Sequence, residues 1–165
     1  MNDFNVGAAV RETYRYFSQT MQEKLAPYDI PLGMFYFFCV LWQQDGQSQR
    51  ELSDRVGTVE AATVEQLRKM EARGFITRRA SIVDRRKMHV FLTPTGRALR
   101  REVMALAAEV NASALESLNN GEIGFLRLAL IQIRKNLVAN GSKASRGAVN
   151  RTMEAVPKPP RRAAR

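Results

Sequence analysis

The chain has 165 residues, of which 45% are hydrophobic and 25% charged, with a single Cys and a single His. This length and apolar content suit one domain with a real core, and they exclude a wholly disordered chain. One Cys excludes an internal disulfide and a multi-cysteine zinc site, so we expect no metal and no cofactor. No apolar run is long enough to span a bilayer, and the first residues lack a secretion signal, which predicts a cytoplasmic protein.

The net charge of +10 is concentrated in two segments. Residues 50–101 hold thirteen Lys and Arg against six acids, and residues 140–165 hold seven against one. The remaining parts of the chain are slightly acidic. Basic segments of this kind usually face polyanions, so double-stranded DNA is a candidate partner. A solvated basic surface is the alternative.

The first two predicted elements are helices. Between residues 6 and 25, apolar side chains recur at intervals of three and four, which is the pattern of an amphipathic helix. Pro27 ends this helix. Residues 32–42 are apolar almost all round, so we expect a second helix that is buried on several sides.

Two short helices joined by a tight turn follow. Ser48 stands three residues before Glu51, which is the capping-box spacing that opens a helix, and Gly57 ends that helix. A second helix, capped by Thr58, is predicted over residues 59–73. Its buried stripe is expected at Val59, Ala62 or Thr63, Leu67 and Met70. The pair is a candidate helix-turn-helix, and any other compact helical pair is the alternative.

The apolar period then changes to two. Residues 75–80 and 87–93 alternate between apolar and polar side chains, which predicts an antiparallel hairpin. Helices are predicted over residues 94–118 and 122–138. From residue 140 onward few large apolar residues occur, so we expect a basic, disordered tail.

A hairpin directly after a helix-turn-helix is a wing. Its tip carries Arg85, Arg86 and Lys87, which can reach phosphates or the minor groove beside a helix that lies in the major groove. Asp84 is expected to stabilise the wing by pairing with an arginine at the hairpin base, such as Arg78, Arg79 or Arg86, because phosphates would repel it. A solvated turn is the alternative. The order of elements therefore predicts a mainly α fold with a small β-hairpin wing, a winged helix-turn-helix.

The stretch that starts at Arg50 resembles the DNA-binding core of the MarR family of winged-helix regulators. The motifs that carry the resemblance are "ELSDRVG", "KMEARGFITRR" and "DRRKMHVFLTPTGRAL", in this order and spacing. The resemblance extends in pattern over about residues 5–138. It implies a homodimeric repressor or activator whose two winged helices meet successive major grooves of a near-palindromic operator, with half-sites about one helical turn apart.

The resemblance also implies a division of the chain. Residues 1–139 would form the family domain, with a DNA-binding lobe over about 45–97. Dimerisation helices would cover about 4–26 and 95–139, and their apolar stripes would be exposed in a lone monomer. Residues 140–165 have no counterpart in the family.

Candidate DNA contacts follow by position. Ser48, Gln49 and Arg50 open the first helix of the motif and can bind phosphate. On the second helix, a glutamate can accept a hydrogen bond from cytosine, a small apolar side chain can touch a thymine methyl, and an arginine can reach guanine or phosphate. The residues assigned to these roles are Glu60 or Glu65, Ala61 or Val64, and Arg68. The wing contributes Arg78, Arg85, Arg86 and Lys87. Many family members have Ser, Thr and Arg on this helix, so base preference does not carry over.

Family members commonly bind a small aromatic ligand between the dimer helices and the DNA-binding lobe. The residues that match such a site are Arg11, Tyr14, Arg15, Phe17, Phe35, Phe38 and Trp42. The two arginines, one turn apart, can hold a carboxylate or a phosphate. The expected effector is an aromatic acid or an aryl acyl-CoA thioester. Core aromatics with solvated arginines are the alternative reading of the same residues.

Two other classes of function compete with a regulator. An enzyme needs a positioned nucleophile, base or metal set, and the sequence contains no such arrangement, so we expect a non-enzyme. A non-specific architectural DNA-binding protein would depend on its basic tail for most of its affinity. Deleting residues 140–165 separates this alternative from a regulator, which should keep its operator preference.

Overall fold

The structure is a computed structural model that describes residues 5–81 and 87–154, with side chains described as far as residue 140. The helices are α1 (Val6–Leu25), the 3-10 turn η1 (Ala26–Tyr28), α2 (Leu32–Gln43), α3 (Gln49–Val56), α4 (Glu60–Ala72), α5 (Pro94–Ala98), α6 (Arg100–Leu115) and α7 (Asn120–Glu154). The strands are β1 (Gln47–Ser48), β2 (Ile76–Ala80) and β3 (Met88–Leu92). The chain divides into two compact units, residues 1–114 and residues 115–165.

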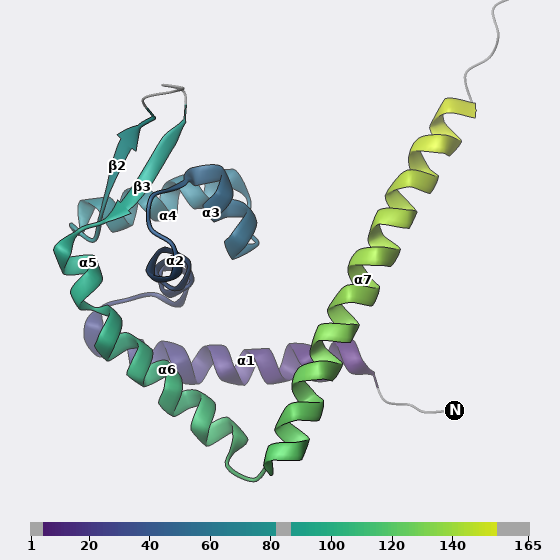
Figure 1. The fold of residues 1–165 in the computed structure, drawn as a ribbon, viewed down its shortest axis with the longest axis horizontal. Helices are drawn as coiled ribbons and strands as arrows, with labels where there is room; N and C mark the ends of the chain where they lie inside the picture. The colour runs from purple at the N-terminus through teal and green to yellow at the C-terminus, as the bar shows by residue number, and fades with distance from the viewer. Residues whose placement is uncertain (1–4, 82–86, 155–165) are drawn as a thin grey trace, which may run out of the picture. The chain divides into compact units, whose positions relative to one another are not determined.

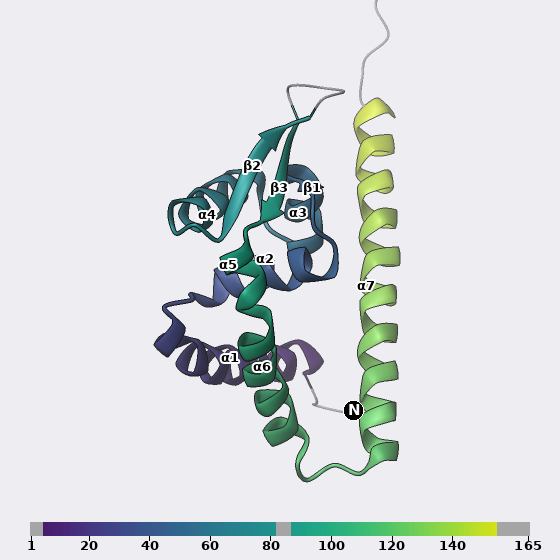
Figure 2. The ribbon, with the colours of Figure 1, turned by 60° about the vertical axis from the view of Figure 1, so that its left-hand side comes forward.

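The first unit is built around α2. This helix buries Phe38 and Leu41 almost completely, and both views place it between α1 and the α3–α4 pair (Figure 1, Figure 2). The Phe38 ring stacks on Trp42 at 4.9 Å between centroids and meets the Phe75 ring edge-on at 5.4 Å. The indole Nε1 of Trp42 donates a hydrogen bond of 2.9 Å to the Gly96 carbonyl. The aromatic residues of α2 thus connect this helix to the residue before β2 and to α5.

A small sheet carries the predicted hairpin. Its strand order is β1-β3-β2 and both pairings are antiparallel, with Gln47 opposite Val90 and Ile76 opposite Leu92. The amide of Ser81 donates to the Lys87 carbonyl at 2.8 Å at the outer end of the hairpin. The period-two pattern therefore predicted β2 and β3 correctly. β1 was not predicted because two residues are too few to show a period.

Polar side chains fix the turn after α2 against the sheet. Asp45 accepts hydrogen bonds from the amides of Gly46 and Leu92 and forms an ion pair with Arg97. Arg55 on α3 donates to three glutamine side chains. These acceptors are Gln43, Gln44 and Gln47. The α2–β1 turn, α3 and the end of β3 are therefore held together by hydrogen bonds as well as by apolar packing.

Some predicted element bounds are wrong. α4 begins at Glu60, and its N-cap is Val59, which is 69% exposed and makes no side-chain capping bond, so the predicted Thr58 cap and a buried Val59 are not observed. The helix predicted over residues 94–118 is interrupted at Leu99 between α5 and α6. Thr63, Leu67 and Met70 are buried as predicted.

α7 is longer than the sequence analysis predicts. It continues through residues 140–154, a segment that was predicted to be disordered. The segment contains Ala, Lys and Arg, which favour a helix, and the first proline after it is Pro157. Its two glycines, Gly141 and Gly147, each cost about 1 kcal/mol relative to alanine, which such a sequence tolerates.

No single helix in the described ranges has the length and apolar character to cross a membrane. Taken together, α1–η1 and α2 pass the same test by length and composition, as a pair bent by 83°.

Candidate nucleic-acid interface

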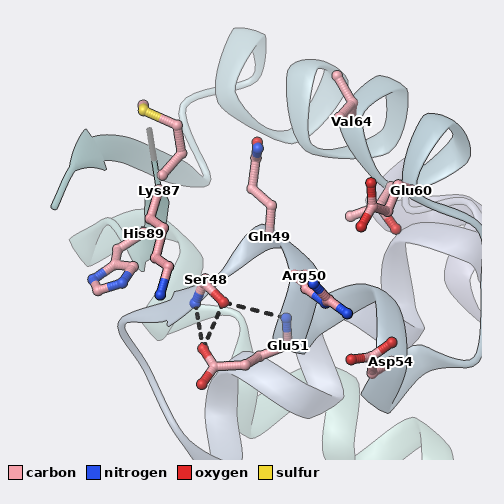
Figure 3. A pocket seen from close by; sticks show the side chains of 11 residues that line it. Ser48, Gln49, Arg50, Glu51, Asp54, Glu60, Val64, Lys87 and His89 are labelled. Atoms are coloured by element: carbon pink, nitrogen blue, oxygen red, sulfur yellow. Dashed lines mark hydrogen bonds between the residues drawn. The ribbon is translucent and has the colours of Figure 1, made fainter. Parts of the chain in front are cut away.

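α3 begins with the capping box that the sequence predicts. The Ser48 Oγ accepts a hydrogen bond from the Glu51 amide at 3.3 Å, and the Glu51 carboxylate accepts from the Ser48 amide at 2.8 Å (Figure 3). The Ser48 hydroxyl also donates to Glu51 at 2.7 Å. These bonds hold the pKa of Glu51 below its usual range. The serine hydroxyl proton is thus used within the helix cap, and Ser48 retains only acceptor capacity.

A hollow of about 570 Å³ lies between α3, α4 and the start of β3, and we name it the α3–α4–β3 hollow. Its lining residues are Ser48, Gln49, Arg50, Glu51, Asp54, Glu60, Thr63, Val64, Lys87, Met88 and His89. Figure 3 shows Lys87 and His89 on one side and Glu60 and Val64 on the other, with Gln49 and Arg50 between them. Cationic and acidic side chains therefore share one surface.

This hollow brings together six of the predicted DNA contacts, which are Ser48, Gln49, Arg50, Glu60, Val64 and Lys87. Asp54, Met88 and His89 line it as well, and the sequence analysis did not select them. Asp54 lies one turn after Arg50 on α3, and that spacing was the signal that could have found it. Asp84, Arg85 and Arg86 lie outside the described residues.

The exposed face of α4 continues beyond the hollow. Ala61, Glu65 and Arg68 are exposed, in line with Val64. The Arg68 guanidinium donates to Glu65 through Nε at 3.0 Å and through Nη2 at 2.9 Å. Lys69 Nζ lies 3.5 Å from the same carboxylate. Arg68 and Lys69 hold the pKa of Glu65 below its usual range, so it is a fully ionised carboxylate at neutral pH.

Arg78 occupies a different position from the other predicted contacts. Its guanidinium donates to the Glu71 carboxylate at 2.9 and 2.6 Å, and its backbone amide donates at 3.1 Å. The Arg78 side chain is only 23% exposed. Arg78 therefore joins β2 to the end of α4, and the structure does not place it on the hollow.

The Glu71–Arg78 pair makes a pH-dependent contribution to stability. Its hydrogen bonds lower the pKa of Glu71, so the contribution is complete above the unfolded-state pKa of about 4.3 and is lost as pH falls through the lower folded-state pKa. At pH 7 the Glu71→Gln variant should lose unfolding free energy, because the ion pair with Arg78 is removed. The loss should be about 1 kcal/mol, since solvent partly screens the pair. Urea titrations followed by circular dichroism should show this difference shrinking below about pH 4. A difference in unfolding free energy that stays constant from pH 7 to pH 3 would argue against a contribution from the ionised Glu71.

A second hollow, of about 280 Å³, lies between α1, α2 and α6, and we name it the α1–α2–α6 hollow. It is lined by Tyr14, Phe17, Ser18, Met21, Leu32, Phe35, Tyr36, Ala107, Val110 and Asn111. Tyr14 and Tyr36 meet through their hydroxyls at 3.4 Å. Burial and Tyr14 raise the pKa of Tyr36 to about 12, while the bond to Tyr36 lowers the pKa of Tyr14. Tyr36 therefore remains protonated at neutral pH.

Three of the seven predicted ligand residues line this second hollow, namely Tyr14, Phe17 and Phe35. Phe38 and Trp42 lie instead in the core described above. Arg11 and Arg15 line a separate hollow on the exposed side of α1, and the Arg15 guanidinium lies 4.4 Å over the Tyr16 ring. The seven residues predicted to share one ligand site are thus divided among the α1–α2–α6 hollow, the core and a separate hollow on α1.

Comparisons with known proteins place this geometry in a family. The family model of the MarR family matches residues 38–88. The HTH-type transcriptional repressor Rv2887 of Mycobacterium tuberculosis is 30% identical over 115 residues, which cover 70% of this chain and 78% of the repressor. The chain belongs to the MarR family. A MarR transcriptional regulator from Methanosarcina mazei has the same fold, with a TM-score of 0.75 and 27% identity over 81% of this chain and 97% of that one.

Other MarR-type relatives are similar over different lengths. The HTH-type transcriptional regulator TtmR of Methylorubrum extorquens is 26% identical over 59% of this chain, which spans half of that protein. BpsR of Bordetella bronchiseptica is 25% identical over 81% of this chain and 98% of BpsR, with a TM-score of 0.69. The BpsR structure is described as showing how 6-hydroxynicotinic acid regulates DNA binding by that protein.

Membership of the MarR family confirms the predicted winged helix-turn-helix. In this MarR-family chain, α3 and α4 are the helix-turn-helix, and β2 and β3 form the wing. The relatives are named as regulators or repressors of transcription, and the chain is accordingly a DNA-binding transcriptional regulator.

The single cysteine of this MarR-family protein is expected to be unreactive. Cys39 lies within α2, and burial raises the pKa of its thiol to about 11. Because the thiolate is the reactive form, its population at pH 8 should be about 100-fold lower than for a thiol with the reference pKa of 9.0. Iodoacetamide should therefore label Cys39 much more slowly in the folded chain than in urea. Equal labelling rates would contradict this expectation.

Proposed function

We propose that this chain is a homodimeric repressor that binds a near-palindromic operator and is released from it by a small aromatic acid. α4 would enter the major groove, while the N-terminal end of α3 and the wing would contact the adjacent phosphates. The observation that carries the proposal is the α3–α4–β3 hollow, where five residues selected for DNA contact meet beside Ser48, whose own donors are used in the helix cap. Selection of bound duplexes from a random pool should yield two half-sites about one helical turn apart. A single unpaired half-site would contradict the dimer.

Apolar side chains on the two terminal helices support a dimer. Val6 and Val10 on α1 are 40% and 47% exposed, and Leu130 and Leu137 on α7 are 47% and 68% exposed. Single exposed apolar residues are normal, but a repeated apolar pattern along a helix favours a partner surface. A second copy would cover these side chains.

The size of the α1–α2–α6 hollow favours a single aromatic ring as the effector. Its volume of about 280 Å³ is at the lower end of the range for small-molecule sites, and the nucleotide part of an acyl-CoA thioester would have to lie outside it. BpsR, whose DNA binding responds to an aromatic acid, is 25% identical to this chain. Arg11 and Arg15 line the separate hollow on the exposed side of α1, so a carboxylate, or the phosphates of a CoA thioester, would have to extend out of the α1–α2–α6 hollow past Tyr14 to reach them.

A thermal-shift screen can test the effector. Aromatic monoacids should raise the melting temperature and release bound DNA more effectively than their CoA thioesters. Tyr14→Phe and Phe17→Ala should weaken this response, and Phe125→Ala, on the exposed surface of α7, should not. The reverse order of the two ligand classes would favour the thioester, and no response to either would contradict the site.

Phosphate contacts should be visible in the salt dependence of operator binding. Arg50 lines the α3–α4–β3 hollow, so Arg50→Ala should weaken binding and reduce the slope of log K against log salt by about 0.9. Arg85→Ala should do the same, because the sequence analysis assigns Arg85, between β2 and β3 along the chain, to the phosphate contacts. Arg101→Ala is the matched control, because Arg101 is an exposed arginine of α6 that does not line the hollow. An unchanged slope for Arg50→Ala would remove this residue from the contact surface.

A further inference from the structure

The Glu65–Arg68 pair on α4 has no evident role in stability. Both side chains are about half exposed or more, at 48% and 63%, and an exposed ion pair of this kind on a helix contributes little to stability because solvent screens it. The pair nevertheless lies on the helix face that the proposed function directs toward the bases. The pair is therefore a candidate for a role in DNA binding.

The hydrogen bonds fix which edge of the Arg68 guanidinium remains available. Glu65 engages Nε and Nη2, which form one of the two paired edges of the group. Three of the five N–H donors remain, two on Nη1 and one on Nη2, so the end edge of the guanidinium is still complete. An end edge with two parallel donors matches the O6 and N7 acceptors that guanine presents in the major groove.

The order of Glu65 and Arg68 along α4 determines where the guanidinium lies. Long side chains on a helix lean toward its N-terminus, and Glu65 stands three residues before Arg68 in that direction. The carboxylate thus holds the guanidinium over the N-terminal half of α4, where a recognition helix meets the base edges. Without Glu65, Arg68 would be free to turn toward the nearest phosphate.

We propose that Glu65 is a positioning residue that presents the end edge of Arg68 to a guanine in each half-site. This inference rests on the proposed operator binding by α4. It differs from a role in which Glu65 itself accepts a hydrogen bond from cytosine, because here the carboxylate acts on the base only through Arg68, to which it is bound by two hydrogen bonds. Lys69 lies 3.5 Å from the same carboxylate, so the cluster of Glu65, Arg68 and Lys69 has a net charge of +1 facing the DNA.

The test compares base preferences selected from a random duplex pool. The wild-type chain, Glu65→Ala, Arg68→Ala and the double variant are each used for selection, and affinities are then measured for the selected duplex and for its G-to-A substitutions. Arg68→Ala should lose a guanine preference of about tenfold at one position in each half-site. Glu65→Ala should reduce the preference at the same position while binding random duplex more tightly, because one negative charge is removed. In the double variant, the guanine preference at this position should be the same as in Arg68→Ala.

The control is Glu109→Ala, which removes the carboxylate of another exposed ion pair, 2.9 Å from Lys24, on α6. It should leave every base preference unchanged. A cytosine preference that depends on Glu65 but not on Arg68, or additive losses in the double variant, would overturn the positioning role while leaving operator binding intact. A wild-type chain without any base preference would overturn the proposed function, and this inference with it.

Discussion

Replacing Gly96 with alanine is expected to destabilise the first unit by about 3 kcal/mol or more, a large effect for one added methyl group. A Cβ at this position would lie 2.2 Å from the Phe75 carbonyl oxygen and 3.2 Å from Leu92. The oxygen cannot move freely, because it accepts hydrogen bonds from the amide and the hydroxyl of Thr93. Displacing Gly96 instead would disturb its bond from Trp42.

Gly33→Ala is the matched control for this variant. Gly33 lies near the start of α2, where a Cβ would meet only Gln66, at an ordinary contact distance of 3.9 Å. Alanine should be neutral there, or stabilising by up to about 1 kcal/mol, because it is the better helix former. Urea unfolding followed by circular dichroism measures both. Equal midpoints for the two variants would show that α5 can move away from β2 at little cost.

The second large effect is expected from introducing charge on α7. In the double variant Leu130→Glu, Leu137→Glu, two negative charges would replace apolar side chains seven residues apart on one face of the helix. If that face joins two copies, each glutamate would be buried without a partner, and the dimer should dissociate. Loss of bivalent binding should then weaken operator affinity by about 100-fold or more.

The control places the same charges at positions of α7 that are already polar, Gln132→Glu with Asn136→Glu. Light scattering after gel filtration should give the mass of two chains for the wild type and the control, and of one chain for the leucine variant. A leucine variant that keeps the mass of two chains would show that dimerisation does not depend on this face of α7.

Much of the fold could be predicted because local sequence and tertiary packing agree. The alternating residues of the wing strands, the capping box at Ser48 and the glycine at position 57 each specify one local structure, and each was observed. Where the pattern was too short or ambiguous, prediction failed. Val59 fits a helical stripe, but at the N-cap of α4 it lies outside the helix and is exposed.

The candidate site was less predictable than the fold because it depends on pairings between side chains. Arg78 is basic and belongs to the hairpin, yet Glu71 across the turn binds it. Phe38 and Trp42 have the spacing of a pocket wall, yet their rings stack on each other in the core. A helical period predicts which face of a helix a side chain lies on, but it does not predict which residue that side chain contacts.

The stacked indole of Trp42 has a practical consequence. Trp42 is the only tryptophan in the chain, and it is buried against Phe38 and hydrogen-bonded to the Gly96 carbonyl. The tryptophan fluorescence of the protein, excited selectively over its tyrosines, therefore comes from one buried environment. A red shift in its emission would report that α2 and α5 have separated, without an added dye or label.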